Sequence, residues 1–104
     1  MADKDKILKR IKDSVKATAP GATLILYGSY ARGDYREDSD IDILVLTNEE
    51  KITYQEKKNI VSPIYHIELE TGIIISTMFL SKKTWDAHCI TPFYKNVMKE
   101  GLVL

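Results

Sequence analysis

The sequence predicts an α/β fold in which helices pack against a small mixed β-sheet. Three short runs, residues 23–27, 41–46 and 73–80, are rich in apolar and β-branched residues, as buried strands are. Around these runs, apolar residues recur at helical spacing behind recognisable helix-capping residues. A chain of 104 residues has room for one core and little more, so we expect a single domain over residues 1–104.

The first expected elements are a helix over residues 3–18 and a strand over residues 23–27. The apolar residues of the helix recur every three or four positions and mark one buried face: Ile7, Leu8, Ile11 and Val15. Pro20 and Gly21 stop the helix. The strand reads Thr-Leu-Ile-Leu-Tyr, which is short and apolar enough to lie inside a sheet.

A Gly-Ser turn follows the first strand. Gly28 allows a sharp backbone turn, and Ser29 is the expected cap of a short helix that runs towards Arg32. The first N–H groups of a helix have no internal partner, so they attract anions such as phosphate. The residues therefore predict a phosphate-binding turn, although a Gly-Ser pair alone is common and means little.

Two aspartates open the second expected strand. Side chains alternate along a strand, so Asp40 and Asp42 share a face with Leu44 and Leu46. Two carboxylates this close repel each other unless a cation lies between them. Mg²⁺ suits that position because it takes oxygen ligands from carboxylates and from substrate phosphates. The alternative is a solvated strand end, which is what an isolated Asp-x-Asp usually is.

A long helix is expected between the second and third strands. Thr53 begins a capping box, and Gly72 is the expected stop. The apolar positions should line one side of the helix: Ile60, Val61, Ile64, Ile67 and Leu69. Pro63 falls inside this pattern and should kink the helix or split it, with Ser62 as a new cap.

The C-terminal third is expected to contain a strand, two helices and an edge strand. The strand covers residues 73–80, and Ser81 caps the short helix after it. Thr91 caps the last helix, with Pro92 at its first position. Residues 102–104 then pair as a short edge strand. We expect the larger aromatic residues of the two helices to lie in the core rather than to form a platform for base stacking: Trp85 and Phe93.

Residues 28–45 resemble the signature of the DNA polymerase β nucleotidyltransferase superfamily. The pattern is G-S-x-A-R-G followed by S-D-I-D-[IL]-L-V, and it lies on the expected strand–turn–helix–loop–strand. The short chain is similar to the minimal nucleotidyltransferase group of that superfamily. The resemblance implies a nucleotidyltransferase fold like the polymerase β palm, in which Gly28 and Ser29 hold the triphosphate of a nucleotide.

The same resemblance implies roles for the residues after the turn. Asp40 and Asp42 are the implied catalytic pair, and they bind the Mg²⁺ ions that bridge the phosphates of ATP or another nucleoside triphosphate. Arg32 matches the family arginine, either as a phosphate contact or as a packing residue of the loop. Ser39 orders the approach to Asp40. The implied nucleotide-binding set is Gly28, Ser29, Arg32 and Ser39.

The chain departs from the resembled family at a third carboxylate, which active members usually carry on the strand after the next helix. The matching run, residues 73–80, contains no Asp or Glu, and the nearest position is Ser76. Glu68 and Glu70 precede Gly72 and could approach the site only in a different register. Catalysis with one metal ion, or with an acid from a partner chain, is the expectation that remains.

Composition and charge exclude several classes of protein. Fifteen basic and fifteen acidic residues cancel, so no overall field draws the chain to nucleic acid or to an anionic membrane. No apolar run approaches the roughly twenty residues of a membrane span, and the N-terminus lacks an apolar signal core. Cys89 is the one cysteine, so an internal disulfide is excluded, and we expect a cytoplasmic protein.

The resemblance implies a nucleotidyltransferase that moves a nucleoside monophosphate, in the expected case AMP from ATP, to a hydroxyl group. The resemblance implies a partner protein as the acceptor, because minimal nucleotidyltransferases often occur with a small helical partner of the HEPN type in toxin–antitoxin pairs. The alternative is a nucleotide-binding module of weak or no activity, which acts by binding such a HEPN-type partner.

Overall fold

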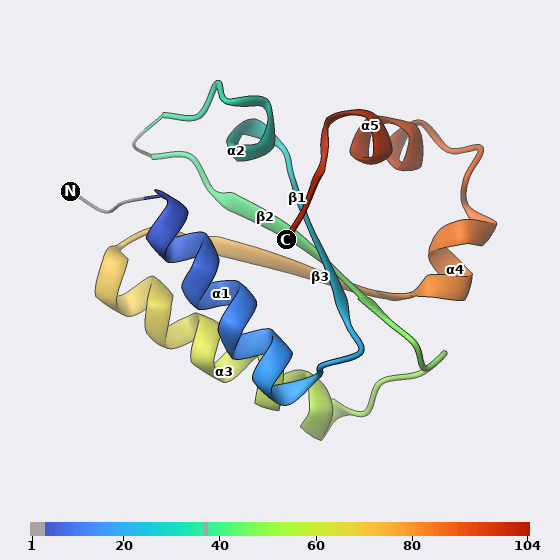
Figure 1. The fold of residues 1–104 in the computed structure, drawn as a ribbon, viewed down its shortest axis with the longest axis horizontal. Coiled ribbons are helices and arrows are strands. Elements are labelled where there is room, and N and C mark those ends of the chain that lie inside the picture. The colour runs from blue at the N-terminus through green and yellow to red at the C-terminus, as the bar shows by residue number, and fades with distance from the viewer. Residues whose placement is uncertain (1–3, 37) are drawn as a thin grey trace.

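The computed structural model describes residues 4–36 and 38–104, and within these ranges four strands form one mixed sheet (Figure 1). The strands are β1 (Thr23–Tyr27), β2 (Ile41–Thr47), β3 (Ile75–Ser81) and β4 (Leu102–Val103), and their order in the sheet is β3–β2–β1–β4. The expected α/β class with a mixed sheet is confirmed. Strand β1 has its predicted range, and β3 begins and ends later than predicted.

The pairing of the strands places three polar side chains at one end of the sheet. Strand β1 pairs antiparallel with both β2 and β4, whereas β2 and β3 run parallel. Asp42 of β2 lies opposite Tyr27 of β1 and, on its other side, beside Ser76 of β3. Residues paired across a ladder point to the same face of the sheet, so these three side chains share one face.

Helices α1 (Lys4–Thr18) and α3 (Tyr54–Thr71) lie side by side over the other face (Figure 1). Their buried side chains meet those of the strands in the larger core: Ile7, Ile11, Val15, Leu24, Leu26, Ile43, Val45, Ile60, Ile64 and Ile67. The removal of this apolar surface from water is the main force that holds both helices on the sheet. The predicted start of the first helix, Asp3, lies outside the described residues.

Helices α4 (Lys82–Ala87) and α5 (Pro92–Glu100) pack on the face that carries Asp42. A smaller buried cluster joins them to the strands: Ile25, Leu44, Leu46, Trp85 and Val97. The predicted caps are confirmed, since the side chains of Ser81 and Thr91 each accept a hydrogen bond from the backbone N–H three residues on. Both caps fix the directions in which α4 and α5 leave their loops.

Helix α3 does not split at Pro63, so the expected new cap at Ser62 is wrong. A proline inside a helix costs about 3 kcal/mol because it removes a hydrogen bond and crowds the preceding turn. Here Ile60 and Ile64 are buried on either side of the proline and hold both halves of the helix on the core. Two apolar residues expected on the buried side are instead exposed: Val61 and Leu69.

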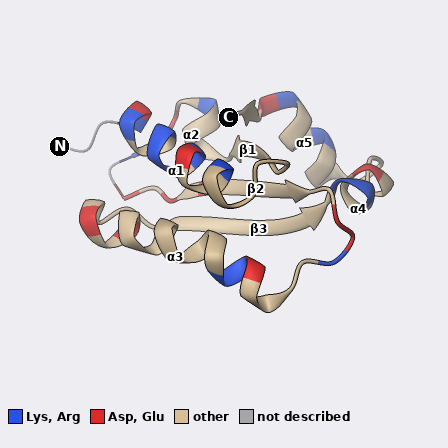
Figure 2. Ribbon diagram, turned by 60° about the horizontal axis from the view of Figure 1, so that its bottom comes forward, with Lys and Arg blue, Asp and Glu red and all other residues tan. Residues whose placement is uncertain are grey.

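Charged residues lie almost entirely outside the sheet. Figure 2 shows residues of both signs, Lys and Arg in blue and Asp and Glu in red, spread over the helices and loops. Asp42 is the only charged residue in the described strands. Across the described ranges, the structure contains no helix with both the length and the apolar character needed to cross a membrane.

Candidate functional site

The turn after β1 is built around Gly28. Its backbone angles, φ 76° and ψ −156°, lie in a region that is essentially restricted to glycine. Gly28 is the N-cap of α2 (Ser29–Arg32), and its carbonyl accepts the first two intrahelical hydrogen bonds, both at 3.1 Å. The expected side-chain cap at Ser29 is therefore wrong, because Ser29 already lies in the helix and the cap residue has no side chain. The N–H groups of Ser29 and Tyr30 precede these helical bonds, as at any helix start.

The turn lies directly against the carboxylate of Asp42. A Cβ atom added at Gly28 would be 2.5 Å from Asp42 Oδ2, which is closer than non-bonded atoms approach. Glycine is thus required here for two reasons, the backbone conformation and the space that the carboxylate occupies. The fold brings together the turn and the aspartate pair, as the sequence predicts.

Asp42 is half-buried, and its pKa is raised above the ordinary value for an aspartate. Burial is the largest cause, and the negative charge of Asp40 adds to it, while the positive charge of Arg32 acts in the opposite direction. Asp40 immediately precedes β2 and is exposed. The two carboxylates are therefore close enough for their charges to interact.

Arg32 ends α2 and connects it to α5. Its Nε lies 3.3 Å from Asp34 Oδ2, and its Nη1 lies 3.5 Å from Glu100 Oε2. All three side chains are exposed, so both ion pairs are weak and screened by solvent. The guanidinium group is therefore positioned beside the turn without being held there tightly.

Ser39 forms two hydrogen bonds with Arg36 shortly before Asp40. Its hydroxyl accepts a hydrogen bond from the Arg36 N–H at 2.7 Å, and its own N–H donates to the Arg36 carbonyl at 3.0 Å. Both bonds lie shortly before the aspartate pair, and the role of Ser39 in ordering the approach to Asp40 stays a prediction. A direct contact between Ser39 and a nucleotide stays a prediction.

The position beside Asp42 on β3 is Ser76, as the sequence indicated. The two nearest acidic candidates are engaged elsewhere: Glu68 accepts a hydrogen bond from the start of β3 at 2.7 Å, and Glu70 pairs with an arginine of α1 at 2.8 Å. Among the residues that the structure describes, no three His, Cys, Asp or Glu side chains gather closely enough to hold a metal ion. The carboxylates that remain for a cation are Asp40 and Asp42.

A cavity of about 460 Å³ adjoins the turn. Gly28 and Arg32 line one side of it, and Phe93, Asn96 and Glu100 of α5 line the other. Phe93 was expected in the core but is 39% exposed at this cavity. Sequence reasoning missed the contribution of α5 because no local pattern links a C-terminal helix to a turn near the N-terminus.

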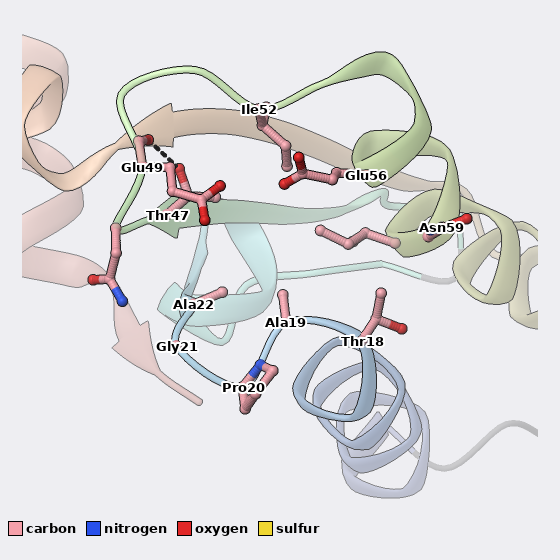
Figure 3. A pocket seen from close by; sticks show the side chains of 12 residues that line it. Thr18, Ala19, Pro20, Gly21, Ala22, Thr47, Glu49, Ile52, Glu56 and Asn59 are labelled. Atoms are coloured by element: carbon pink, nitrogen blue, oxygen red, sulfur yellow. Dashed lines mark hydrogen bonds between the residues drawn. The ribbon is translucent and has the colours of Figure 1, made fainter.

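A second cavity, of about 340 Å³, lies at the other end of the sheet (Figure 3). It includes Thr47 at the end of β2, which is roughly 17 Å from Asp42 at about 3.3 Å per strand residue. Two of its polar groups are paired locally: the Glu49 carbonyl accepts from the Thr47 hydroxyl, and Glu56 accepts from Thr53 in the cap of α3, both at 3.0 Å. None of the predicted site residues lines this cavity.

Comparisons with known proteins agree with this geometry. A family model described as "Nucleotidyltransferase domain" matches residues 6–104. The chain is also similar to a protein of Methanocaldococcus jannaschii named "Putative protein adenylyltransferase", with 32% identity over 104 residues that cover 98% of each chain. The matched region contains every residue of the turn and of the aspartate pair.

Two solved structures share the fold. One, described as a "putative minimal nucleotidyltransferase", has a TM-score of 0.61 at 24% identity and covers 99% of this chain and 97% of that chain. The other is a chain of the MntA–HpeT toxin–antitoxin crystal structure, with a TM-score of 0.55 at 19% identity, covering 100% of this chain and 72% of that chain. The expected nucleotidyltransferase fold is thereby confirmed.

Proposed function

The chain belongs to the nucleotidyltransferase domain family, and on that basis we propose that it transfers AMP from ATP to a hydroxyl group of a partner protein. One observation carries the proposal: the Gly28 turn lies against the carboxylate of Asp42, which follows Asp40 at the start of β2. A phosphate held at the turn would be within reach of a cation held by the two carboxylates.

The two carboxylates suit Mg²⁺ as that cation. Mg²⁺ usually takes one or two protein carboxylates and completes its coordination with water and substrate phosphates, and Asp40 and Asp42 supply this number. Gly28 leaves a space beside its backbone that the Asp42 carboxylate occupies and that a Cβ atom would fill. This close approach of carboxylate and turn supports a role for Asp42 in holding the cation. When bound, Mg²⁺ would neutralise negative charge on the triphosphate.

In the proposed reaction, the hydroxyl oxygen of the acceptor bonds to the α-phosphorus of ATP. The bond from that phosphorus to the bridging oxygen breaks, pyrophosphate leaves with the electron pair, and the hydroxyl proton passes to water. The chain contributes mainly by positioning and by charge. The Gly28 turn presents backbone N–H groups to phosphate, and Arg32 adds a positive charge once its weak ion pairs give way.

The names of similar proteins support a protein as the acceptor. The relative from M. jannaschii is named as a protein adenylyltransferase, and one structural neighbour comes from a toxin–antitoxin complex. We therefore propose a small helical partner of the HEPN type as the acceptor in a toxin–antitoxin pair. The single, exposed Cys89 is consistent with the reducing cytoplasm as the setting of this pair.

A second function is favoured by the neighbour of Asp42 on β3. Ser76 occupies the position where a third carboxylate would complete the site, and its hydroxyl is a poor metal ligand. A missing general base commonly lowers an enzymatic rate by about 10²–10⁴. The second candidate is therefore a nucleotide-binding module that controls its HEPN-type partner by binding it, with slow transfer or none.

Calorimetric titration with Mg-ATP tests the site. A variant with Asp40→Asn and Asp42→Asn should lose the metal dependence and most of the nucleotide affinity. A control with Asp13→Asn and Asp86→Asn, which changes two exposed carboxylates on α1 and α4, should bind as the parent does. Parent-like binding of Mg-ATP by the site variant would show that the site is misplaced.

Mass spectrometry of the partner tests the transfer. After incubation with Mg-ATP and this chain, the partner should gain the mass of one AMP group, and the gain should disappear with the site variant. An unmodified partner in the presence of tight Mg-ATP binding would favour the second candidate. Modification of a small molecule in place of the partner would refute a protein acceptor.

A further inference from the structure

The cavity between the Gly28 turn and α5 has the size and lining of a small-molecule site. Its volume of about 460 Å³ falls within the range of about 300–1,000 Å³ that ligand pockets occupy. Gly28 and Arg32 form one wall, and Phe93, Asn96 and Glu100 of α5 form the other, so the lining combines aromatic, amide and charged groups. Such a mixture can both stack on a flat ligand and fix its orientation.

The cavity is continuous with the turn proposed to hold phosphate. Gly28 belongs to both, and Tyr27, which also lines the cavity, lies opposite Asp42 in the β1–β2 ladder. Because paired residues point to the same face, the cavity and the Asp42 carboxylate are on the same side of the sheet. A nucleotide with its phosphates at the turn would therefore have this cavity within reach of its nucleoside.

Phe93 offers a fixed aromatic surface in this cavity. Its ring is held edge-on by Tyr27, at 5.5 Å and 87° between the rings, and by Trp85, at 5.8 Å and 84°. The side chain is nevertheless 39% exposed, so part of the ring is free for a ligand. A ring that is already ordered loses little entropy when a base stacks on it.

Asn96 lies one helical turn after Phe93 and lines the same cavity. Its side chain is exposed and forms no hydrogen bond with any residue in the described ranges. A side-chain amide carries both a donor and an acceptor, which matches the adjacent donor and acceptor of adenine. Guanine presents two acceptors on the corresponding edge, and the amide fits that pattern less well.

Glu100 and Arg32, which both line the cavity, form an ion pair with each other. Its carboxylate lies on α5, 3.5 Å from the Arg32 guanidinium. Because the two charges are exposed and lie beside each other, they largely offset one another, and neither one by itself sets the direction of a bound nucleotide. The direction follows instead from the proposed phosphate site: with the triphosphate at Gly28 and the aspartate pair, the nucleoside reaches the lining residues of α5.

We propose that this cavity is the nucleoside pocket of the chain, in which Phe93 stacks on the base and Asn96 selects adenine over guanine. The inference rests on the proposed nucleotidyl transfer and extends it, because it names the residues of α5 that choose the base. Helix α5 lies outside the motif of residues 28–45, and the inference gives this helix a role in nucleotide binding.

Calorimetry with three probes, Mg-ATP, Mg-GTP and Mg-tripolyphosphate, separates base recognition from phosphate binding. Asn96→Leu, which keeps the side-chain size, should weaken ATP binding about tenfold to a hundredfold and leave GTP and tripolyphosphate unchanged. Phe93→Leu should weaken both nucleotides about tenfold and leave tripolyphosphate unchanged. Met98→Leu, at an exposed position of α5 outside the cavity, is the matched control and should bind all three probes as the parent does.

Binding of Mg-tripolyphosphate with the affinity of the parent shows that a variant still folds and keeps its phosphate site. If Asn96→Leu and Phe93→Leu both bind ATP as tightly as the parent, the pocket is refuted while the proposed function stands. If the parent binds neither ATP nor tripolyphosphate with Mg²⁺, the proposed function fails and the pocket fails with it. Equal parent affinity for ATP and GTP would refute the selection of adenine by Asn96.

Discussion

Replacement of Gly28 by alanine tests the geometry of the site most directly. The substitution should destabilise the fold and also weaken the binding of Mg-ATP. Two separate costs arise, because an alanine must adopt φ 76° and ψ −156°, and its Cβ must occupy a point 2.5 Å from Asp42 Oδ2. The first cost acts on the backbone of the turn, and the second displaces the carboxylate proposed to hold the metal ion.

The structure allows the size of the effect to be worked out. A residue other than glycine in this backbone region costs about 1–3 kcal/mol. Moving the Asp42 side chain away from its preferred rotamer adds about 1 kcal/mol. The total of about 2–4 kcal/mol corresponds to a fall of roughly 10–20 °C in the melting temperature of a domain of this size.

Gly72→Ala is the matched control. Gly72 ends α3 with φ 74° and ψ 6°, and a Cβ atom there would meet nothing within 4 Å. Its cost is therefore backbone strain alone, about 1–2 kcal/mol, with no effect on nucleotide binding. Thermal unfolding and Mg-ATP calorimetry of both variants provide the measurement. The reasoning is refuted if Gly28→Ala is no more destabilising than Gly72→Ala and binds Mg-ATP equally well.

Three further changes have defined outcomes. Ser76→Asp should strengthen Mg²⁺ binding and raise the transfer rate by about 10² or more, because the new carboxylate lies beside Asp42. The side chain in Thr77→Asp points to the other face of the sheet, so this control variant should change neither quantity, and equal effects of the two substitutions would show that the register is wrong. Burial and Asp40 raise the pKa of Asp42, so without divalent cations the free energy of unfolding should fall as pH rises through that pKa. Urea unfolding should therefore show Asp42→Asn more stable than the parent at neutral pH, with no advantage in acid. Gly101→Ala should lower the free energy of unfolding in urea by about 1–3 kcal/mol, because the added Cβ would meet the Val97 carbonyl and a side chain of β1. An unchanged urea midpoint would contradict the packing of α5 on the sheet.

The local elements of this fold were predictable because their signals are short-range. The apolar run of β1 and the caps Thr53, Ser81 and Thr91 depend on residues at most a few positions apart. Pro63 shows where such signals fail. The sequence shows the local cost of a proline, but the packing of α3 on α1 and the sheet, which exceeds that cost, involves residues far away in the chain.

The sequence by itself determined the order of the elements, the glycine turn after β1 and the placement of two aspartates at the start of a strand. These features follow from local backbone preferences and from the alternation of side chains along a strand. Only the tertiary structure decided that the Gly28 turn lies in direct contact with the Asp42 carboxylate and that α5 lines the cavity beside them. Each of these contacts joins segments that are distant in the chain, and only the pairing of the strands and the packing of their two faces bring those segments together.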